Sequence, residues 1–327
     1  MTIISIIGAG AWGSALALAA HRGGNQVRLY SPLDGEVRTL NDTRTNAVGA
    51  TIPTDILISS DLAQVTKDCD VVVLAPPAQK MGSACEALLP FIKNSIPLII
   101  TSKGIENKTH RLMSEVVGSI FPSNPLAVLS GPSFATEVSK GLPTAVTLAS
   151  ADMKVAARLC EIYSSSHFRP YASTDIIGAQ AGGALKNVIA IACGVLEGMQ
   201  LGDNARAGIV TRGLAEMTRL GVALGAKPET FMGLSGLGDL TLTALSHQSR
   251  NMSFGYALGQ GKTVDELKAS GPLTEGVYTV ESAMALAERY KVDMPITNAV
   301  DALINHGCAV KDLIKDLLSR PLTTEAA

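Results

Sequence analysis

Lys186 is the residue that most directly suggests chemistry, because its neighbours are almost all small or apolar. Residues 178–199 read GAQAGGALKNVIAIACGVLEGM, a composition that predicts a helix buried in a domain core. An unpaired ammonium there would carry a large desolvation cost that packing does not require. We therefore expect Lys186 to face a cleft with a tuned pKa, as an acid/base or as a polariser of a carbonyl group. The alternative is a lysine whose ammonium reaches solvent.

Two loops that follow predicted strands carry further polar groups. Lys103 lies in the sequence TSKG at residues 101–104, and Gly131 and Ser133 lie in SGPSF at residues 130–134. In an open α/β sheet, ligands bind beyond the carboxyl ends of the strands. Lys103 can reach an anion or a carbonyl there, Gly131 lets a ligand approach the main chain, and Ser133 offers a hydroxyl. The alternatives are a solvated loop lysine and a serine that only caps a helix.

The second half of the chain adds a carboxylate and a candidate anion site. Asp239 follows a glycine cluster, GLSGLG at residues 233–238, which has no strand before it and is therefore not a second dinucleotide loop. Asp239 can accept a hydrogen bond from a substrate hydroxyl or from Lys186, or simply cap a helix. Arg250, flanked by Ser249 and Asn251, suits a phosphate or carboxylate, with an exposed arginine at a helix start as the alternative.

A glycine-rich loop near the amino terminus predicts a dinucleotide site. The sequence GAGAWG at residues 8–13 follows an apolar strand and opens a helical stretch. Gly8 permits the tight turn, Gly10 lets a pyrophosphate approach the backbone, and Gly13 allows close packing of helix on strand. The free N–H groups at the helix start complete the anion site. Trp12 either covers the cofactor cleft or packs in the core.

The end of the second strand bears on the choice between NAD and NADP. An acidic residue there binds the ribose hydroxyls of NAD and would repel the 2′-phosphate of NADP. The sequence has Ser31 and Pro32 at this place and an acid only later, at Asp34, which favours NADP or dual use. Neither position carries an arginine to hold the phosphate, and Arg28 lies within the strand. The preference between the two cofactors stays open.

The elements that must position these residues divide the chain into two parts. Apolar runs typical of buried strands lie at residues 3–7, 27–30, 71–74, 98–101, 127–130 and 145–148, with helical stretches such as 11–21 and 81–92 between several of them. This order predicts an α/β, Rossmann-type, doubly wound sheet. Later segments at 176–199, 208–224, 277–290 and 297–305 predict an all-α domain. We place the dinucleotide-binding domain at residues 1–178 and the helical substrate and catalytic domain at 179–327.

The composition excludes several classes of protein. The 327 residues carry a formal charge of −2, with 46% hydrophobic and 17% charged residues, which is not the composition of a disordered chain. Near-zero charge without a block of lysine and arginine argues against nucleic acid or an anionic membrane as a partner. The 5 cysteines are widely spaced, with no C-x-x-C, and no histidine has a partner at metal spacing, so we expect neither disulfides nor a metal.

The first residues resemble a signal peptide only superficially, because MTIISIIGAGAWGSALALAA lacks a charged leading region. No apolar run of membrane-spanning length is free of charge, so we expect no membrane insertion and a cytoplasmic protein.

Taken together, these segments resemble bacterial NAD(P)-dependent glycerol-3-phosphate dehydrogenase. The motifs that carry the resemblance, in order and at matching spacing up to MPI at 294–296, are IGAGAWG at 7–13, SKG at 102–104, SGPSFA at 130–135, LKNVIA at 185–190, TRGLAE at 211–216, GLGDL at 236–240 and QSRN at 248–251. The resemblance implies reversible reduction of dihydroxyacetone phosphate to sn-glycerol 3-phosphate with NADH or NADPH, in support of glycerophospholipid synthesis. It permits a homodimer, with which the long apolar helices are compatible.

The resemblance also implies roles for particular residues. Lys186 matches the catalytic lysine of the family, which accepts the proton in the oxidation direction. Substrate-contacting positions of the family match Lys103, Gly131, Ser133, Lys186, Asp239, Ser249, Arg250 and Asn251. Cofactor-lining positions match Ala11, Trp12, Pro32, Lys103, Ala135, Arg250, Leu273 and Glu275, in addition to Gly8, Gly10 and Gly13. Serine is common in the family at Ala11, and histidine or arginine at Pro32, so polar contacts to the cofactor are lost at both.

Two other functions are compatible with parts of this pattern. A 3-hydroxyacid or 6-phosphogluconate type of dehydrogenase also pairs a dinucleotide domain with a helical domain, but the group Ser249–Asn251 favours a phosphorylated small substrate. A non-catalytic dinucleotide sensor would keep the glycine loop but would not need Lys186 in an apolar helix.

Overall fold

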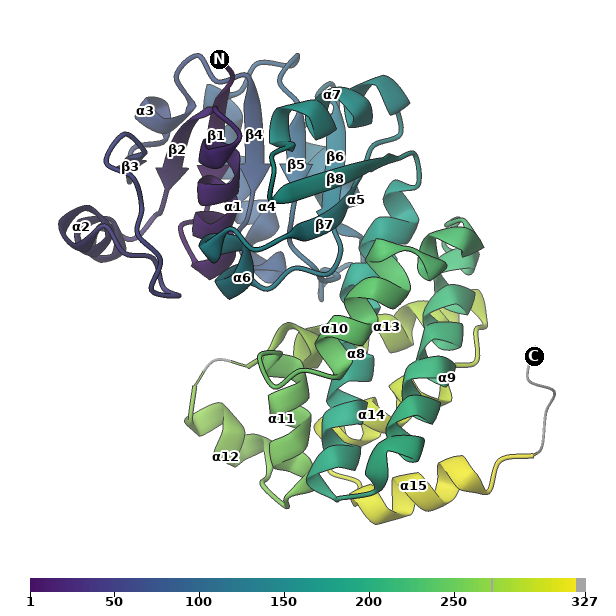
Figure 1. The fold of residues 1–327 in the computed structure, drawn as a ribbon. Coiled ribbons are helices and arrows are strands. Elements are labelled where there is room, and N and C mark those ends of the chain that lie inside the picture. The colour runs from purple at the N-terminus through teal and green to yellow at the C-terminus, as the bar shows by residue number, and fades with distance from the viewer. Residues whose placement is uncertain (272, 322–327) are drawn as a thin grey trace.

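The amino-terminal part of the chain forms one eight-stranded sheet. The computed structural model describes residues 1–271 and 273–321, and Figure 1 shows the sheet above a separate group of helices. The strands are β1 (Ile3–Ile7), β2 (Gln26–Tyr30), β3 (Leu57–Ser59), β4 (Val71–Leu74), β5 (Leu98–Ile100), β6 (Leu126–Ser130), β7 (Thr144–Ala149) and β8 (Phe168–Ser173). Their order is β3-β2-β1-β4-β5-β6-β7-β8, and only the β6–β7 pair is antiparallel. The carboxyl ends of β1, β4, β5 and β6 therefore share one edge.

Helices cover both faces of the sheet, which explains the uninterrupted apolar strands. In β4, Val71 and Val73 pack into one buried cluster, while Val72 and Leu74 pack into another. The first cluster includes residues of α1 (Ala11–Arg22), α6 (Ala135–Lys140) and α7 (Met153–Tyr163), and the second includes residues of α4 (Met81–Leu88) and α5 (Met113–Ile120). Side chains that alternate between two buried faces leave no polar position in the strand. The shorter helices α2 (Asp34–Thr43) and α3 (Leu62–Thr66) lie at the β2–β3 side of the sheet (Figure 1).

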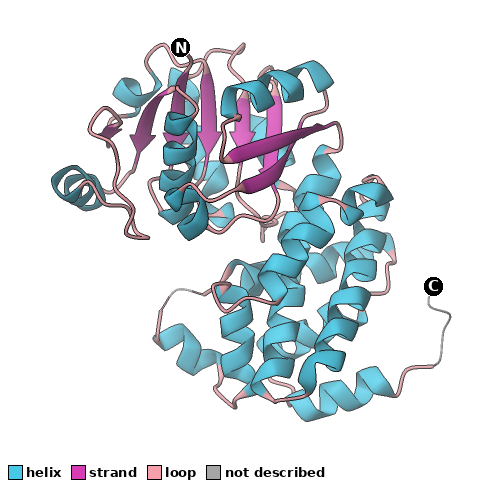
Figure 2. Ribbon diagram, viewed as in Figure 1, coloured by secondary structure: helices cyan, strands magenta, loops and turns pink. Residues whose placement is uncertain are grey.

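The carboxyl-terminal part is built around one long helix. Figure 2 shows only helices and loops there. The central helix is α8 (Ile176–Gly198), and the others are α9 (Gly202–Ala223), α10 (Asp239–Ala244), α11 (Arg250–Gly259), α12 (Val264–Ala269), α13 (Glu275–Tyr290), α14 (Pro295–Asn305) and α15 (Val310–Leu318). By length and composition α8 could cross a membrane, but 83% of its most apolar window is buried inside this protein. It is therefore the core of the helical part.

Glycine lets α11 approach α8 closely. A Cβ atom built on Gly194 of α8 would lie 2.1 Å from the Met252 carbonyl oxygen, and one built on Gly255 of α11 would lie 2.0 Å from the Ile191 carbonyl oxygen. Both distances are far below a normal contact, so any side chain at either position would push the helices apart. This close packing fixes the start of α11, where residues 249–251 lie, relative to α8.

The predicted fold class is confirmed, with differences in detail. The short strand β3 and the edge strand β8 were not predicted, since β3 has only 3 residues and β8 contains Pro170 within a polar sequence. Helix α9 starts at Gly202 and not at residue 208, because its first turn is polar and does not show helical periodicity. The short helices α10, α11 and α12 and the helix α15 were also missed. The sheet ends at Ser173 and α8 begins at Ile176.

Candidate active site

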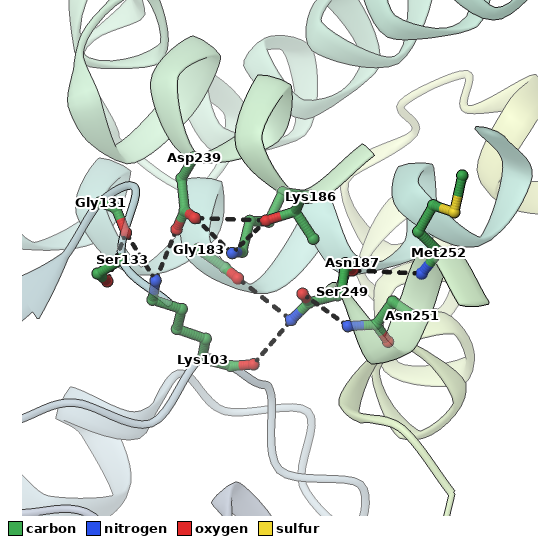
Figure 3. Close-up of polar contacts among 11 residues, drawn as sticks. Lys103, Gly131, Ser133, Gly183, Lys186, Asn187, Asp239, Ser249, Asn251 and Met252 are labelled. Carbon is green, nitrogen blue, oxygen red and sulfur yellow. Dashed lines mark hydrogen bonds and ion pairs between the residues drawn. The ribbon is translucent and has the colours of Figure 1, made fainter. Parts of the chain in front are cut away.

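Lys186 lies in the middle of α8, and its ammonium is paired inside the protein. Its side chain is 8% exposed, and Nζ donates a hydrogen bond to Asp239 Oδ1 at 2.5 Å (Figure 3). Nζ also donates to Thr243 Oγ1 at 2.7 Å. Asp239 and Thr243 lie one turn apart on α10, so both project toward the same point. The Lys186 ammonium is thus stabilised in the core by these two hydrogen-bond partners and not by contact with solvent.

A second lysine shares the same carboxylate. Lys103, just beyond the end of β5, donates from Nζ to Asp239 Oδ2 at 2.7 Å and to the Gly131 carbonyl oxygen at 2.9 Å. The Asp239 side chain is 1% exposed, so these two ammonium groups are its neutralising partners in the protein. Two cations facing one anion leave one positive charge in excess. Such a centre stabilises negative charge that develops on a substrate oxygen.

Burial lowers the pKa of Lys186 toward neutral pH. Loss of hydration lowers its pKa to about 8, and the nearby Lys103 ammonium acts in the same direction, while Asp239 opposes the shift. A group with such a pKa can both give and accept a proton near physiological pH. Lys186 therefore has the burial and the tuned pKa expected of an acid/base.

Glycines in α8 make room for this arrangement. A Cβ atom on Gly183 would lie 2.7 Å from Ser130 Oγ and 3.3 Å from Lys103 Cγ, so glycine allows the Lys103 stem to cross the helix surface. A Cβ atom on Gly182 would lie 2.3 Å from the Ser235 carbonyl oxygen, within the π-helical turn Leu234–Gly238 that leads directly into Asp239. The glycines of α8 thus let neighbouring segments approach the helix closely, in addition to suiting a buried position.

A chain of amide hydrogen bonds ties the starts of α11 and α13 to α8. Asn187 Nδ2 donates to the Lys103 carbonyl oxygen at 3.3 Å, and Asn251 Nδ2 donates to Asn187 Oδ1 at 2.9 Å (Figure 3). Asn251 Oδ1 in turn accepts from the Gly276 N–H at 2.9 Å. Ser249 Oγ caps α11 by accepting from the Met252 N–H at 3.2 Å. These bonds fix the backbone that carries Arg250.

Arg250 and Glu275 lie at the starts of α11 and α13, which the amide hydrogen bonds tie to α8. Arg250 is exposed at the first position of α11. Glu275 begins α13, and burial raises its pKa, although the positive charge of Arg250 and a backbone hydrogen bond involving Ala78 oppose the rise. A Cβ atom on Gly104 would lie 3.2 Å from Glu275 Oε2, which places this carboxylate beside the end of β5.

The glycine loop has the geometry that a dinucleotide requires. Gly8 has a φ of 117°, which favours glycine, and a Cβ atom on Gly13 would lie 1.8 Å from the Gly8 carbonyl oxygen. Around Gly10, at the start of α1, no atom lies within 4 Å of where a Cβ would be, so the approach to the helix N-terminus is open. Within the part of the chain described, the buried Trp12 Nε1 atom finds no hydrogen-bond acceptor. These observations fit a pyrophosphate on this loop.

Replacement of Gly13 by alanine should weaken dinucleotide binding and lower stability. The added methyl group would overlap the Gly8 carbonyl oxygen, so the turn and the start of α1 would have to separate. We expect at least a tenfold weaker affinity (about 1.4 kcal/mol) for NADH and a lower melting temperature. Titration calorimetry and a thermal melt measure the two effects. The matched control is Gly24→Ala: it lies outside the loop in open space and has a φ of 81°, so it costs backbone strain without a clash.

The end of β4 connects the glycine loop to the lysine centre, the group formed by Lys186, Lys103 and Asp239. A Cβ atom on Gly8 would lie 2.8 Å from the Ala75 carbonyl oxygen, and Ser102 Oγ donates to the Pro76 carbonyl oxygen. Lys103 is the next residue in the chain. The predicted cofactor loop and the predicted acid/base centre therefore lie along one edge of the sheet, between the sheet and the helical part.

The other predicted residues take less central places. Ser133 Oγ donates to the Gly131 carbonyl oxygen at 2.9 Å, beside Lys103. Ala11 and Ala135 lie at the starts of α1 and α6, and Pro32 is exposed just after β2. Leu273 is partly buried and packs against a hydrophobic cluster of the helical part.

Two residues that hold the lysine centre were not predicted as site residues. Thr243 binds the Lys186 ammonium, and Asn187 links Lys103 to Asn251. Thr243 follows Asp239 by one helical turn, a spacing that could have suggested a common target once a helix was expected there. Asn187 lies within the motif LKNVIA, but no role was predicted for it.

Comparison with known proteins assigns this architecture to one family. A family model described as NAD-dependent glycerol-3-phosphate dehydrogenase N-terminus matches residues 3–156, and one described as its C-terminus matches residues 175–315. A glycerol-3-phosphate dehydrogenase (NAD(P)+) from Parvibaculum lavamentivorans is 47% identical over 98% of both chains. One from Rhodospirillum rubrum is 48% identical over 98% of this chain and 93% of that protein. A crystal structure of glycerol-3-phosphate dehydrogenase from Coxiella burnetii has a TM-score of 0.92, with 37% identity over 98% of this chain and 99% of the other.

Proposed function

We propose a function that proceeds from one established fact: this chain belongs to the family of NAD(P)-dependent glycerol-3-phosphate dehydrogenases. The enzyme reduces dihydroxyacetone phosphate reversibly to sn-glycerol 3-phosphate with NADH or NADPH. Residues 1–178 hold the dinucleotide, and residues 179–327 supply the acid/base and most of the substrate contacts. The observation that carries the assignment of residues is the buried pair of Lys186 and Lys103 on Asp239, at the edge of the sheet where the glycine loop ends.

Lys186 serves as the acid in reduction and as the base in oxidation. The dinucleotide, when bound, supplies the hydride. The carbonyl oxygen gains negative charge as it is reduced, and the Lys186 ammonium stabilises that charge and then donates the proton that completes the alcohol. Asp239 orients Lys186, and Thr243 accepts a second hydrogen bond, so that the remaining N–H faces the substrate.

The phosphate of the substrate is held at the start of α11. Arg250 lies there, with the backbone fixed by Ser249 and Asn251. Binding energy from a remote phosphate positions a small reactive fragment that would otherwise bind weakly. Lys103 binds the second carboxylate oxygen of Asp239 and adds positive charge beside Lys186.

Replacement of Arg250 by alanine should mainly weaken binding of the phosphorylated ketone. Arg250 is exposed before substrate binds, so we expect a loss of about 2 kcal/mol, roughly a 30-fold rise in KM. Steady-state kinetics with dihydroxyacetone phosphate measure the change. The slow reduction of unphosphorylated dihydroxyacetone serves as the control and should stay the same. An unchanged KM for the phosphorylated ketone would show that the phosphate lies elsewhere.

The two directions of the reaction should depend oppositely on pH. Reduction needs the protonated form of Lys186, whose pKa burial lowers to about 8, so kcat for reduction should fall as pH rises through about 8. Oxidation needs the neutral amine and should fall as pH decreases through the same region. Initial rates at saturating substrates from about pH 6 to about pH 10 test this, with dinucleotide binding followed in parallel. A reduction rate that stays constant to the alkaline end would exclude Lys186 as the acid.

The reaction itself is tested by following NADH and NADPH oxidation separately, with dihydroxyacetone phosphate as substrate. Unphosphorylated dihydroxyacetone is the control. Fast turnover that requires the phosphate supports both the reaction and the anion site. Absence of turnover in folded protein that still binds dinucleotide would contradict the proposed function and favour another hydroxyacid dehydrogenase or a sensor.

The product suggests the cellular role. Glycerol 3-phosphate supplies the backbone for glycerophospholipid synthesis, and we assign the enzyme to that supply in the cytoplasm. Loss of the gene should make growth depend on added glycerol 3-phosphate, which a depletion strain tests. Growth and phospholipid content that are unchanged without the supplement would contradict this role.

A further inference from the structure

A carboxylate lies at the end of β2, although the sequence has no acid directly after that strand. Ser31 is fully buried there, and its Oγ accepts the Leu33 N–H at 3.2 Å and donates to the carboxylate of Glu36. Glu36 lies in the first turn of α2 and is half-buried. The serine thus folds the beginning of α2 back onto the strand end and holds the Glu36 side chain beside it.

This strand end adjoins the glycine loop. The Gly8 N–H donates to the Tyr30 carbonyl oxygen at 2.9 Å, and β2 is the direct neighbour of β1 in the sheet. In a dinucleotide-binding sheet of this topology, the adenosine ribose lies at the end of the second strand. A carboxylate there accepts hydrogen bonds from the ribose hydroxyls and repels a 2′-phosphate.

One oxygen of Glu36 is available for such contacts. Ser31 binds Oε2, and among the residues that the structure describes no hydrogen bond reaches Oε1. The other acid of the same helical turn, Asp34, is exposed and accepts a hydrogen bond from Ser60 Oγ at 2.6 Å, on the side of β3. Of the two carboxylates, Glu36 is the one attached to the end of β2.

The nearby arginines are directed at main-chain carbonyl groups. Arg28 Nη1 donates to the Val65 carbonyl oxygen at 3.4 Å, at the end of α3. Arg44 Nη1 donates to the Ile56 carbonyl oxygen at 3.0 Å, and Arg38 Nε donates to the Asp34 carbonyl oxygen at 3.5 Å. Arg28 and Arg44 are thus bonded to other segments, and Arg38 is bonded to the first residue of α2. The charged group that is hydrogen-bonded to the strand end itself is the carboxylate of Glu36.

We infer that Glu36, positioned by Ser31, makes this enzyme select NADH over NADPH. The inference rests on the dinucleotide site assigned under the proposed function and goes beyond it by naming the cofactor and the residue responsible. It also revises the expectation from sequence, in which the absence of an acid next to the strand favoured NADP or dual use. The acid comes five residues after Ser31 and returns to the strand end only through the fold.

Direct binding of the two cofactors tests this without any turnover. Trp12 is the only tryptophan of the chain and lies in the glycine loop, so quenching of its fluorescence reports binding of NADH and of NADPH. We expect wild-type protein to bind NADH at least about tenfold more tightly than NADPH, as one charged hydrogen bond and one charge repulsion imply. In Glu36→Gln the ratio should fall to within about threefold, mainly through tighter NADPH binding.

Two further variants show which side chain is responsible for the cofactor preference. Ser31→Ala keeps the carboxylate but removes the hydroxyl that holds it, and should reduce the ratio less than Glu36→Gln does. Asp34→Asn removes the other carboxylate of the same turn and should leave the ratio unchanged. A wild-type protein that binds NADPH as tightly as NADH would overturn the inference, and so would a ratio that responds to Asp34→Asn and not to Glu36→Gln. Because the readout is binding, failed turnover of dihydroxyacetone phosphate would contradict the proposed function and leave this test intact.

Discussion

Replacement of Lys186 by alanine should reduce kcat by about 10³-fold or more while dinucleotide affinity stays nearly unchanged. General acid/base catalysis and stabilisation of a developing oxyanion each contribute two or more orders of magnitude, and Lys186 is placed to provide both. The predicted dinucleotide loop is formed by other residues, so the affinity for the cofactor should not depend on this ammonium. Single-turnover and steady-state rates measure the loss, and Trp12 fluorescence measures cofactor binding.

The fold should tolerate this substitution, which makes the result interpretable. In Lys186→Ala the Asp239 carboxylate keeps its ion pair with Lys103, so no buried anion is left alone. The matched control is Lys268→Ala, because Lys268 is exposed on α12 and, among the residues that the structure describes, forms an ion pair with Asp265 alone. Near-normal turnover in Lys186→Ala would exclude the catalytic role, whereas loss of activity in the control would indicate a general defect.

Replacement of Asp239 by asparagine should destabilise the protein and change its pH profile. The substitution leaves two ammonium groups without their shared buried carboxylate, which typically costs about 3–5 kcal/mol in the free energy of unfolding. It should also lower the pKa of Lys186 below its present value of about 8, since Asp239 now favours the charged form. The alkaline decline of the reduction rate should therefore move to lower pH. Denaturant unfolding and pH–rate profiles measure the two effects.

A second substitution distinguishes electrostatics from packing. Lys103→Met removes the excess cation, so in the Asp239→Asn background it should recover part of the lost stability. A double-mutant cycle gives the coupling between the two positions. Strictly additive losses, together with an unshifted pH profile in Asp239→Asn, would mean that Asp239 acts only through packing.

Local sequence determined the scaffold and the residues that suggest chemistry. Buried strands such as β4 need continuous apolar residues, and the glycine loop needs residues without a Cβ, so both leave patterns that can be recognised over a few positions. Lys186 was conspicuous for a similar reason: a charge within a long apolar helix has a cost that demands a partner. The sheet, apart from β3 and β8, and the helical character of the half that follows it could thus be predicted from the chain alone.

Tertiary structure decided how these residues act together. Asp239 is 53 residues from Lys186 and 136 residues from Lys103, and the shared carboxylate exists only because α10 packs against α8 at the end of β5. The same holds for Glu36, whose carboxylate reaches the end of β2 through one hydrogen bond to Ser31. Side-chain direction and burial set both the pKa of Lys186 and the position of the Glu36 carboxylate, and neither follows from spacing along the chain. The sequence, through its resemblance to a known family, therefore identified the reaction, while the fold determined how Lys186 is paired and where Glu36 lies.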